Sequence, residues 1–359
     1  MRVAARVPVD VYAVSDVHAE HGRNAAWTRA LRRRRASDAL VVAGDVADDV
    51  EGVVGTLDAF RDVGFGEVFY TFGNHECWIT GADERRGTRD STEKIREVMR
   101  ACAARGARTK PARVGEKMWI APLHAYHHAS FDTEPDVEEA LPEVSSVMND
   151  FRFAKWPAPL SDRDESVAAW CDALNDDGWD EFLGSIERGD RVISFSHFLP
   201  RIELLPEKRM LFYPKLAQAS GSVFLRRRID AIKERVNDGD LTHVFGHTHF
   251  GWNQTLDGVR YVQAALATPS EWVKRPRSLV VGEFSNESDE PLCVFKDGEF
   301  INDHRAMWSD YYSMHERAPE DVELAPHARE FIRRRWGDKR RSAAADSLPP
   351  PPGATGVID

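Results

Sequence analysis

The sequence has few cysteines, and none of them belongs to a closely spaced pair. The four are scattered along the chain as Cys77, Cys102, Cys171 and Cys293. A zinc ribbon needs pairs separated by two residues, and a disulfide scaffold needs a cysteine-rich small chain, so neither class is favoured. We expect reduced thiols and a cytoplasmic protein.

Long apolar runs are also missing. No stretch of 18 consecutive apolar residues occurs, so the sequence predicts no transmembrane helix. The first residues include Arg2 and Arg6 but no extended apolar core, and we therefore expect no signal peptide. With 359 residues and 42% hydrophobic composition, the chain can bury a sizeable core as one large α/β domain or as two domains.

An excess of positive charge is absent as well. The chain has 48 basic and 59 acidic residues, a formal charge of −11. A surface that grips nucleic acid phosphates nonspecifically is basic, so the sequence gives no strong signal for such a partner. The arginine run 32–35 is interpreted as the solvated end of a helix over 24–35, where cations complement the helix dipole.

Short apolar segments alternate with amphipathic ones over much of the chain. Strands are predicted at 11–15, 40–43, 68–72, 118–121, 191–196 and 241–245. Helices are predicted between or after them at 50–63, 92–105, 166–174 and 222–236. This alternation is typical of parallel βαβ units. Further strands, in antiparallel arrangement, are predicted at 259–262, 278–284 and 292–295.

The changes of pattern along the chain predict its organisation. A catalytic domain is expected over 8–300, with a less regular insertion at about 124–190 and a proline-marked loop at 198–221. A C-terminal helical extension is expected over 301–341, with a helix at 326–336. The proline-rich tail 342–359 is expected to be disordered, because it has too little apolar surface to bury.

Polar side chains with metal-binding capacity follow five of the predicted strands. They are Asp16 with His18, Asp45, Asn74 with His75, His197, and His247 with His249. The carboxyl ends of parallel strands converge on one crevice of an open sheet, so we expect these residues to meet. One such histidine alone would usually be structural, but five independent strand ends together indicate a metal site.

The chemistry of these residues restricts the metal. Carboxylate, imidazole and amide ligands without thiolate suit Mn²⁺, with Fe or Zn²⁺ as alternatives. Seven ligand groups are too many for one tetrahedral site, so two divalent ions are expected. Asp45 has two carboxylate oxygens with which it could bridge both ions.

The order of these motifs resembles the calcineurin-like metallophosphoesterase superfamily. The motifs are Asp16-x-His18, Gly44-Asp45, Gly73-Asn74-His75-Glu76, His197 and Gly246-His247-Thr248-His249. The strings 197–201 and 205–209 are similar to those of a stand-alone, poorly characterised group of members. The resemblance implies a four-layer αββα sandwich, in which two mixed β-sheets pack face to face with helices outside.

The resemblance also implies roles for individual residues. Asp16, His18 and His249 would hold one metal, Asn74, His197 and His247 the other, and Asp45 would bridge them. The arginines of protein serine/threonine phosphatases are replaced by Asp49 and Phe72, and the tyrosine ligand of purple acid phosphatases by Asp48. Neither protein phosphatase activity of that type nor an iron–tyrosinate site is therefore expected.

The predicted function is a dinuclear metal-dependent phosphoesterase acting on a small phosphomonoester or phosphodiester. A metal-bridging hydroxide would attack phosphorus directly. His75 is the candidate general acid, because adjacent side chains diverge and Asn74 is expected to be the ligand. The alternatives are a nucleotide phosphodiesterase or nuclease, and a non-catalytic metal-binding scaffold, which is less favoured because every ligand position is filled.

Substrate-binding residues are harder to identify. Arg201, Lys208 and Arg209 follow His197 and could neutralise phosphate, with a solvated loop as the alternative. Tyr126 and His127 follow a predicted strand and could line the rim. Trp78 could stack on a substrate ring or pack in the core. The oligomeric state is not predicted.

Overall fold

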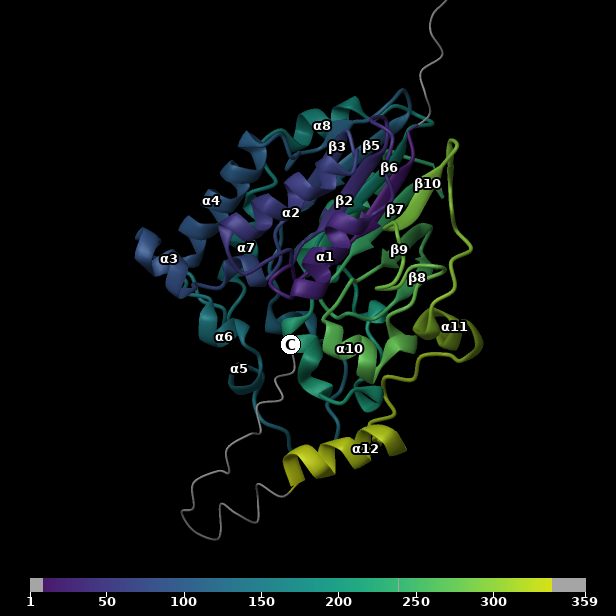
Figure 1. Cartoon of the computed structure of the whole chain (residues 1–359). Helices are drawn as coiled ribbons and strands as arrows, with labels where there is room; N and C mark the ends of the chain where they lie inside the picture. Colours follow the sequence, from purple (N-terminus) through teal and green to yellow (C-terminus); the bar gives the residue numbers. More distant parts are fainter. Residues whose placement is uncertain (1–8, 238, 338–359) are drawn as a thin grey trace, which may run out of the picture.

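The structure is a computed structural model that describes residues 9–237 and 239–337 (Figure 1). The predicted disordered tail and the last residues of the predicted C-terminal extension lie outside the described residues. The chain forms two β-sheets with helices packed around them. None of the helices in the described ranges has the length and apolarity needed to cross a lipid bilayer.

The first sheet is mixed, with the strand order β11-β10-β1-β2-β3. Its parallel strands are β1 (Val11–Val14), β2 (Ala39–Ala43) and β3 (Glu67–Thr71). Two antiparallel strands complete it at one edge, β10 (Leu292–Lys296) and β11 (Glu299–Phe300). All five residues of β2 are buried, as is typical of a parallel strand covered on both faces.

The second sheet is also mixed, with the order β4-β5-β6-β7-β9-β8. Its central parallel strands are β5 (Met118–Pro122), β6 (Arg191–Phe195), β7 (Leu241–Phe245) and β9 (Val259–Gln263). The antiparallel edges are β4 (Ala112–Arg113) and β8 (Trp252–Leu256). Side chains of both sheets belong to one continuous apolar core, and the fold class predicted from the sequence is confirmed.

Helices cover the outer faces of the sheets. The first four are α1 (Gly22–Ala30), α2 (Val50–Asp62), α3 (Gly81–Arg86) and α4 (Ser91–Ala104). The next five are α5 (Val144–Val147), α6 (Asp150–Phe153), α7 (Ser166–Ala173), α8 (Trp179–Ser185) and α9 (Val223–Lys233). The last three are α10 (Pro269–Lys274), α11 (Met307–Met314) and α12 (Pro326–Ile332). Helix α2 packs against β3 and α4, whereas α9 packs against β7 and α7.

Local sequence accounts for where the main helices begin. The side chain of Asp49 caps α2 by accepting a hydrogen bond from the Gly52 amide at 2.7 Å. Asp90 caps α4 in the same way, accepting from the amides of Thr92 and Glu93. The acidic residue at position 49, where protein phosphatases carry arginine, thus has a structural use.

Two of the predicted secondary-structure elements are wrong. The helix predicted over 24–35 ends at Ala30, so the arginine run 32–35 does not complement its dipole. These arginines instead face acidic residues from other segments, with Arg32 on Asp289 and Arg34 on Glu290. The strand predicted at 278–284 is a turn with isolated bridges, and the edge strand β8 was not predicted.

Candidate metal centre

The polar residues predicted as ligands come together at the carboxyl ends of β1, β2, β3, β6 and β7. The loops that carry them meet beside α10 (Figure 1). His197 Nε2 lies 3.2 Å from Asp45 Oδ2, although 152 residues separate them in the sequence. The parallel order of the strands within each sheet brings their loops to one end, as the sequence predicts.

One group consists of Asp16, His18 and His249. His249 Nε2 lies 3.1 Å from Asp16 Oδ1 and 3.2 Å from His18 Nε2. Ligand atoms of the three side chains lie within 4.8 Å of one another, close enough to share one cation.

A second group consists of Asp45, Asn74, His197 and His247. Asn74 Oδ1 lies 3.0 Å from His197 Nε2 and 2.9 Å from His247 Nδ1. Ligand atoms of Asp45, His197 and His247 also lie within 4.8 Å of one another. The backbone amide of His247 donates to Asp16 Oδ1 at 2.9 Å and so connects the two groups.

The outer nitrogens of the four imidazoles face oxygen acceptors. The partners are Glu20 for His18 at 3.2 Å, the Ala43 carbonyl for His197 at 2.9 Å, the Ala219 carbonyl for His247 at 2.7 Å and Glu271 for His249 at 2.8 Å. A proton on the outer nitrogen leaves the inner nitrogen free as a ligand, which is the usual arrangement of metal-binding histidines. The donor set therefore fits divalent cations.

The backbone at these positions is strained. Five predicted ligands have positive φ values: Asp16 (53°), His18 (46°), Asp45 (50°), His247 (76°) and His249 (51°). Residues other than glycine seldom adopt this conformation, and it clusters at functional sites. The loops thus adopt an energetically unfavourable backbone conformation at these positions, and this conformation directs the five side chains to one point.

Glycines allow the loops to approach the ligands closely. A Cβ on Gly44 would lie 2.7 Å from His197 Nδ1, and one on Gly246 would lie 2.9 Å from Asp16 Oδ2. Gly44 also has a φ of +80°. Gly44 and Gly246, each of which directly precedes a ligand, therefore provide the space in which the ligand of another loop lies.

The electrostatics favour bound positive charge. Burial alone would raise the pKa of Asp45, but the neighbouring His197 and His75 hold it well below its usual value. Burial alone would lower the pKa of His249, but Glu271 and Asp16 raise it to about 10. The carboxylates stay ionised and draw positive charge into the space between them.

His75 is oriented for a different role. Its Nδ1 lies 2.7 Å from Asp48 Oδ1, and its Nε2 lies 3.9 Å from Asp45 Oδ2. The ring packs on Trp78 with a centroid distance of 3.7 Å. The carboxylate of Glu76 instead accepts hydrogen bonds from the backbone amides of Gly73 and Val46, both at 2.6 Å. Asp48 therefore orients His75, whereas Glu76 ties two site loops together.

The three cations predicted to bind phosphate are paired within the protein. Arg201 contacts Glu203 and Asp257, Lys208 contacts Asp132 and Asp136, and Arg209 contacts Glu207 and Asp321. The structure does not bring these cations to the candidate metal centre, because acidic residues from several other segments compensate their charge.

The three aromatic residues predicted to contact the substrate lie in different environments. Tyr126 is fully buried against Phe198 and Trp156, so the structure places it in the core and not on the rim. His127 is also buried, and its ring lies nearly parallel to that of His247 with centroids 6.5 Å apart. Trp78 lies against His75, at the centre itself.

A cavity of about 50 Å³ opens at the candidate metal centre. Its lining residues are Asp45, Asn74, His75, Trp78, Met148, Asn149, Asp150, His247 and His249. Neither lysine nor arginine occurs among these described residues. Any charge on a bound phosphoryl group must therefore be compensated by other cations.

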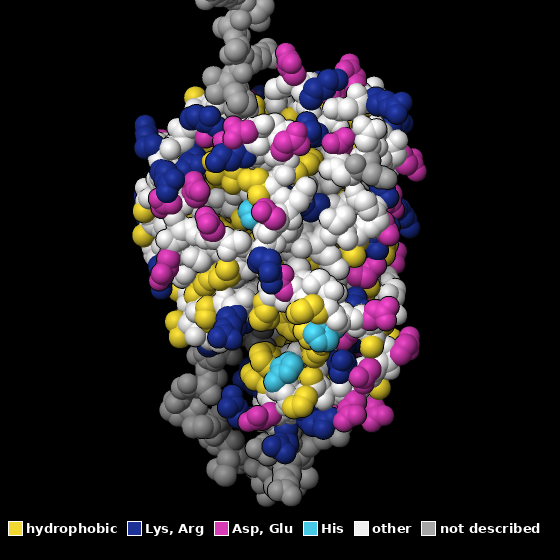
Figure 2. All heavy atoms as spheres, turned by 90° about the vertical axis from the view of Figure 1, so that its right-hand side faces the viewer, with side chains coloured by type: hydrophobic (Ala, Val, Ile, Leu, Met, Phe, Trp, Pro, Cys, Tyr) yellow, Lys and Arg dark blue, Asp and Glu magenta, His cyan; other side chains and the backbone are white. Residues whose placement is uncertain are grey.

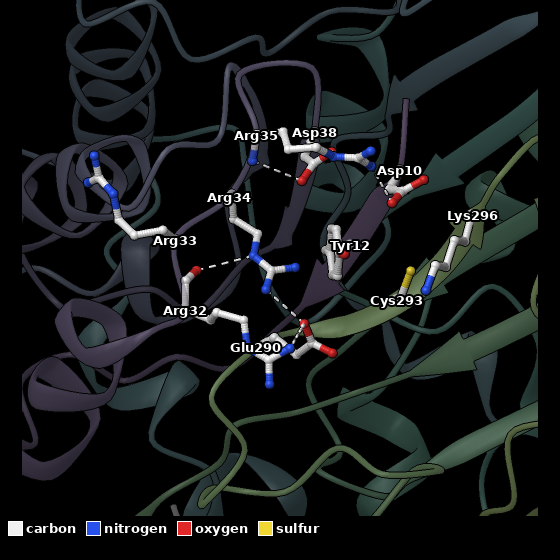
Figure 3. A pocket seen from close by; sticks show the side chains of 10 residues that line it. All are labelled: Asp10, Tyr12, Arg32, Arg33, Arg34, Arg35, Asp38, Glu290, Cys293 and Lys296. Carbon is white, nitrogen blue, oxygen red and sulfur yellow. Dashed lines mark hydrogen bonds and ion pairs between the residues drawn. The ribbon is translucent and has the colours of Figure 1, made fainter. Parts of the chain in front are cut away.

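A larger cavity, of about 270 Å³, lies beside the amino end of β1, away from the ligand-bearing strand ends. The arginine run 32–35 borders it together with Tyr12 (Figure 3). Arg35 contacts Asp10 and Asp38, and Arg34 contacts Glu290 across the opening. These arginines therefore join the loop before β2 to its neighbours.

Glu20, Glu271 and Asp150 contact predicted ligands and were missed by sequence reasoning. Glu271, which contacts His249, forms a capping box with Thr268 at the start of α10, and this motif is visible in the sequence. Asp150 contacts Asn74 and gives no local signal, since the insertion that carries it is rich in acids. Contacts over such sequence distances cannot be read from local patterns.

Comparisons with known proteins agree with this fold. The family model for calcineurin-like phosphoesterases matches residues 9–251. The acyl-carrier-protein phosphodiesterase PptH of Mycobacterium tuberculosis is 26% identical over 278 residues, which cover 74% of this chain and 80% of the relative. The crystal structure of the phosphopantetheinyl hydrolase PptH from Mycobacterium tuberculosis is similar, with a TM-score of 0.57 and 23% identity, covering 76% of this chain and 94% of that one. At this identity the structural likeness concerns the fold.

Proposed function

The chain belongs to the calcineurin-like phosphoesterase family, and on this basis we propose that it hydrolyses a phosphodiester with the help of two divalent cations. Membership makes it a phosphoric ester hydrolase. The family implies divalent metal ions, and the structure offers groups of residues able to hold them.

We assign the ligands by the two groups described above. Asp16, His18 and His249 would hold one ion, Asn74, His197 and His247 the other, and Asp45 both. When bound, two Mn²⁺ ions would lower the pKa of a water molecule and offset charge on the phosphoryl oxygens. The arrangement of the inner imidazole nitrogens is the observation that supports this assignment most directly.

His75 would then protonate the leaving oxygen. Asp48 accepts a hydrogen bond from Nδ1–H of protonated His75. The proton that can be transferred is therefore the one on Nε2, the nitrogen nearer to Asp45. A general acid so placed contributes about 10²–10⁴-fold in rate. No side chain needs to form a bond to phosphorus, so we expect direct attack by water.

The charge of the residues that line the cavity supports a diester substrate. A phosphomonoester is largely a dianion at neutral pH, whereas a diester is a monoanion. With carboxylates of Asp45 and Asp150 in the lining and neither lysine nor arginine among the described lining residues, the cavity favours the lower charge. PptH is named an acyl-carrier-protein phosphodiesterase, so a phosphopantetheinyl diester on a carrier protein is the first substrate that we propose to test.

A polymeric nucleic acid is the less favoured diester. On the face that carries α11, Lys and Arg side chains are mixed with Asp and Glu and form no continuous basic stripe (Figure 2). The net charge of −11 points the same way.

The experiment compares three esters, with Mn²⁺ added to protein purified without chelator. They are nitrophenyl phosphate, bis-nitrophenyl phosphate and a phosphopantetheinyl carrier protein. We expect kcat/KM for the aryl diester to exceed that for the monoester at least about tenfold, or about 1.4 kcal/mol. The kcat/KM of the Asp45→Asn variant for the aryl diester should be at least about 100-fold lower than that of the parent. Faster monoester hydrolysis would overturn the proposed substrate class, and fewer than one metal ion per chain without hydrolysis would favour a scaffold.

A further inference from the structure

We infer that Asp150 is a positioning residue, whose carboxylate holds the Asn74 amide in the orientation that a metal ligand requires. The inference rests on the proposed function, because it assumes that Asn74 binds a cation. Asp150 is the first residue of α6 and is 1% exposed. It comes from the segment predicted as a less regular insertion, and it reaches the centre itself.

The hydrogen bonds of Asn74 determine which end of its amide faces the ligands. Asn74 Nδ2 donates to Asp150 Oδ1 at 2.9 Å. An ionised carboxylate only accepts hydrogen bonds, so the amide nitrogen must face Asp150. The amide oxygen is thereby directed to His197 and His247, at 3.0 and 2.9 Å. With the opposite orientation, two oxygens would face each other and an NH₂ group would face the imidazoles.

The same carboxylate oxygen also holds Trp78. The indole Nε1 of Trp78 donates to Asp150 Oδ1 at 2.7 Å. Trp78 in turn packs on the ring of His75, the candidate general acid. One oxygen atom of Asp150 thus fixes both a candidate ligand and the surface on which the candidate acid rests.

A carboxylate at position 150 is energetically unfavourable because the position is buried. Burying an ionised group is costly unless polar partners compensate it. Asp150 Oδ2 lies 3.3 Å from Nε2 of His127, which is also 1% exposed. An apolar side chain of similar size would fill the same space without that cost. The need for an acceptor that faces the Asn74 amide explains why a polar side chain is present here.

Two variants separate positioning from packing and from charge. Asp150→Leu keeps the branching at Cγ and removes the acceptor, whereas Asp150→Asn removes the charge and can still offer one oxygen to Asn74 and Trp78. Asp177→Leu changes an exposed carboxylate in the same segment, which is paired with the exposed Lys110, and serves as the control. Each full-length chain is freed of metal with chelator and titrated with Mn²⁺ alone in a calorimeter.

We expect the parent, Asp177→Leu and Asp150→Asn to bind two ions with similar affinities. Asp150→Leu should bind one ion like the parent and the other about 10–100-fold more weakly, the usual effect of losing a residue that orients a ligand. In the Asn74→Ala background, the same Asp150→Leu change should alter neither affinity further. Should Asp150→Leu not fold, Asp150→Ser removes the carboxylate with less apolar surface and is titrated in its place.

The outcomes are distinguishable. Two unchanged affinities in folded Asp150→Leu, or equal weakening in Asp150→Asn, would overturn the positioning role and leave the proposed function standing. Equal weakening of both sites would also overturn it, because a general packing defect would then explain the loss. A parent chain that binds no Mn²⁺ would overturn the proposed metal centre together with this inference.

Discussion

Gly73 and Asp45 are in direct contact: a Cβ atom on Gly73 would lie 2.1 Å from Asp45 Oδ1. The same carboxylate oxygen accepts a hydrogen bond from the backbone amide of His75 at 3.0 Å. The loop after β3 therefore determines where the central carboxylate of the candidate metal centre can lie. A small change in that loop should act on metal binding before it acts on the rest of the fold.

We predict that Gly73→Ala displaces Asp45 and lowers both metal content and kcat/KM. A loss of about 100-fold or more is expected, since shifts of about 1 Å in a catalytic group cost that much. Gly55→Ala is the matched control, because Gly55 lies within α2 with no atom within 4 Å of the added Cβ. That variant should keep its activity and gain about 0.5–1 kcal/mol in free energy of unfolding. Full metal content and activity in Gly73→Ala would contradict the packing described.

His75→Ala should affect substrates according to their leaving groups. A diester with an alkyl leaving group needs a proton on the departing oxygen, so its hydrolysis should slow about 10²–10⁴-fold. A nitrophenyl diester leaves without a proton and should slow much less. Steady-state rates on both esters, with metal content measured on the same samples, decide the point. Equal losses on the two esters would remove His75 from the role of acid.

Lys94 and Asp83 form a fully buried ion pair, with Lys94 Nζ 2.9 Å from Asp83 Oδ2. Lys94 Nζ also donates to the backbone carbonyls of Asp48 and Trp78, which flank His75. Lys94→Met should lower the free energy of unfolding by about 3–5 kcal/mol, because it removes the buried cation from the buried Asp83 carboxylate and leaves Arg86 as its charged partner. Denaturant titration measures this change.

The exposed pair of Lys155 and Glu84 provides the comparison for that measurement. Its side chains are 50% and 58% exposed, and Lys155→Met should cost no more than about 1 kcal/mol. A similar cost for the buried and the exposed lysine would show that the buried pair contributes nothing special.

Stability should fall in mild acid because of His243. This side chain is fully buried between the hydroxyls of Ser194 and Ser196, and burial lowers its pKa to about 3. The unfolded chain binds the proton near pH 6.5, so the stabilising contribution is complete above that pH and is lost as the pH falls toward 3. The expected loss between pH 6.5 and 5 is about 2 kcal/mol.

His243→Gln isolates this contribution, since glutamine can pair with hydroxyls but does not titrate in this range. Its free energy of unfolding should vary less between pH 7 and 5 than that of the parent, by about the same 2 kcal/mol. The measurement is a denaturant titration at both pH values. Parallel pH dependences in the two proteins would show that His243 is not responsible.

The errors about the arginine run and about the predicted phosphate-binding cations have a common physical origin. The helix over 24–35 was extended too far because the carboxylates that hold Arg32 and Arg34 come from residues 289 and 290. Arg201, Lys208 and Arg209 looked free for the same reason, since most of their acidic partners lie on distant segments. In the sequence, a charged side chain appears free to bind a ligand. Its counterion is recognised only when the fold brings the two segments together.

The sequence by itself determined the parallel strands that carry the site and the seven candidate ligands beyond their ends, because short apolar runs and the polar residues that end them are local features. Only the tertiary structure decided that Asp48 orients His75, that Glu271 contacts His249 and that Asp150 holds Asn74. Hydrogen bonds between loops depend on distances of a few tenths of an ångström. Those distances are set by how the whole core packs, and no local stretch of sequence contains them.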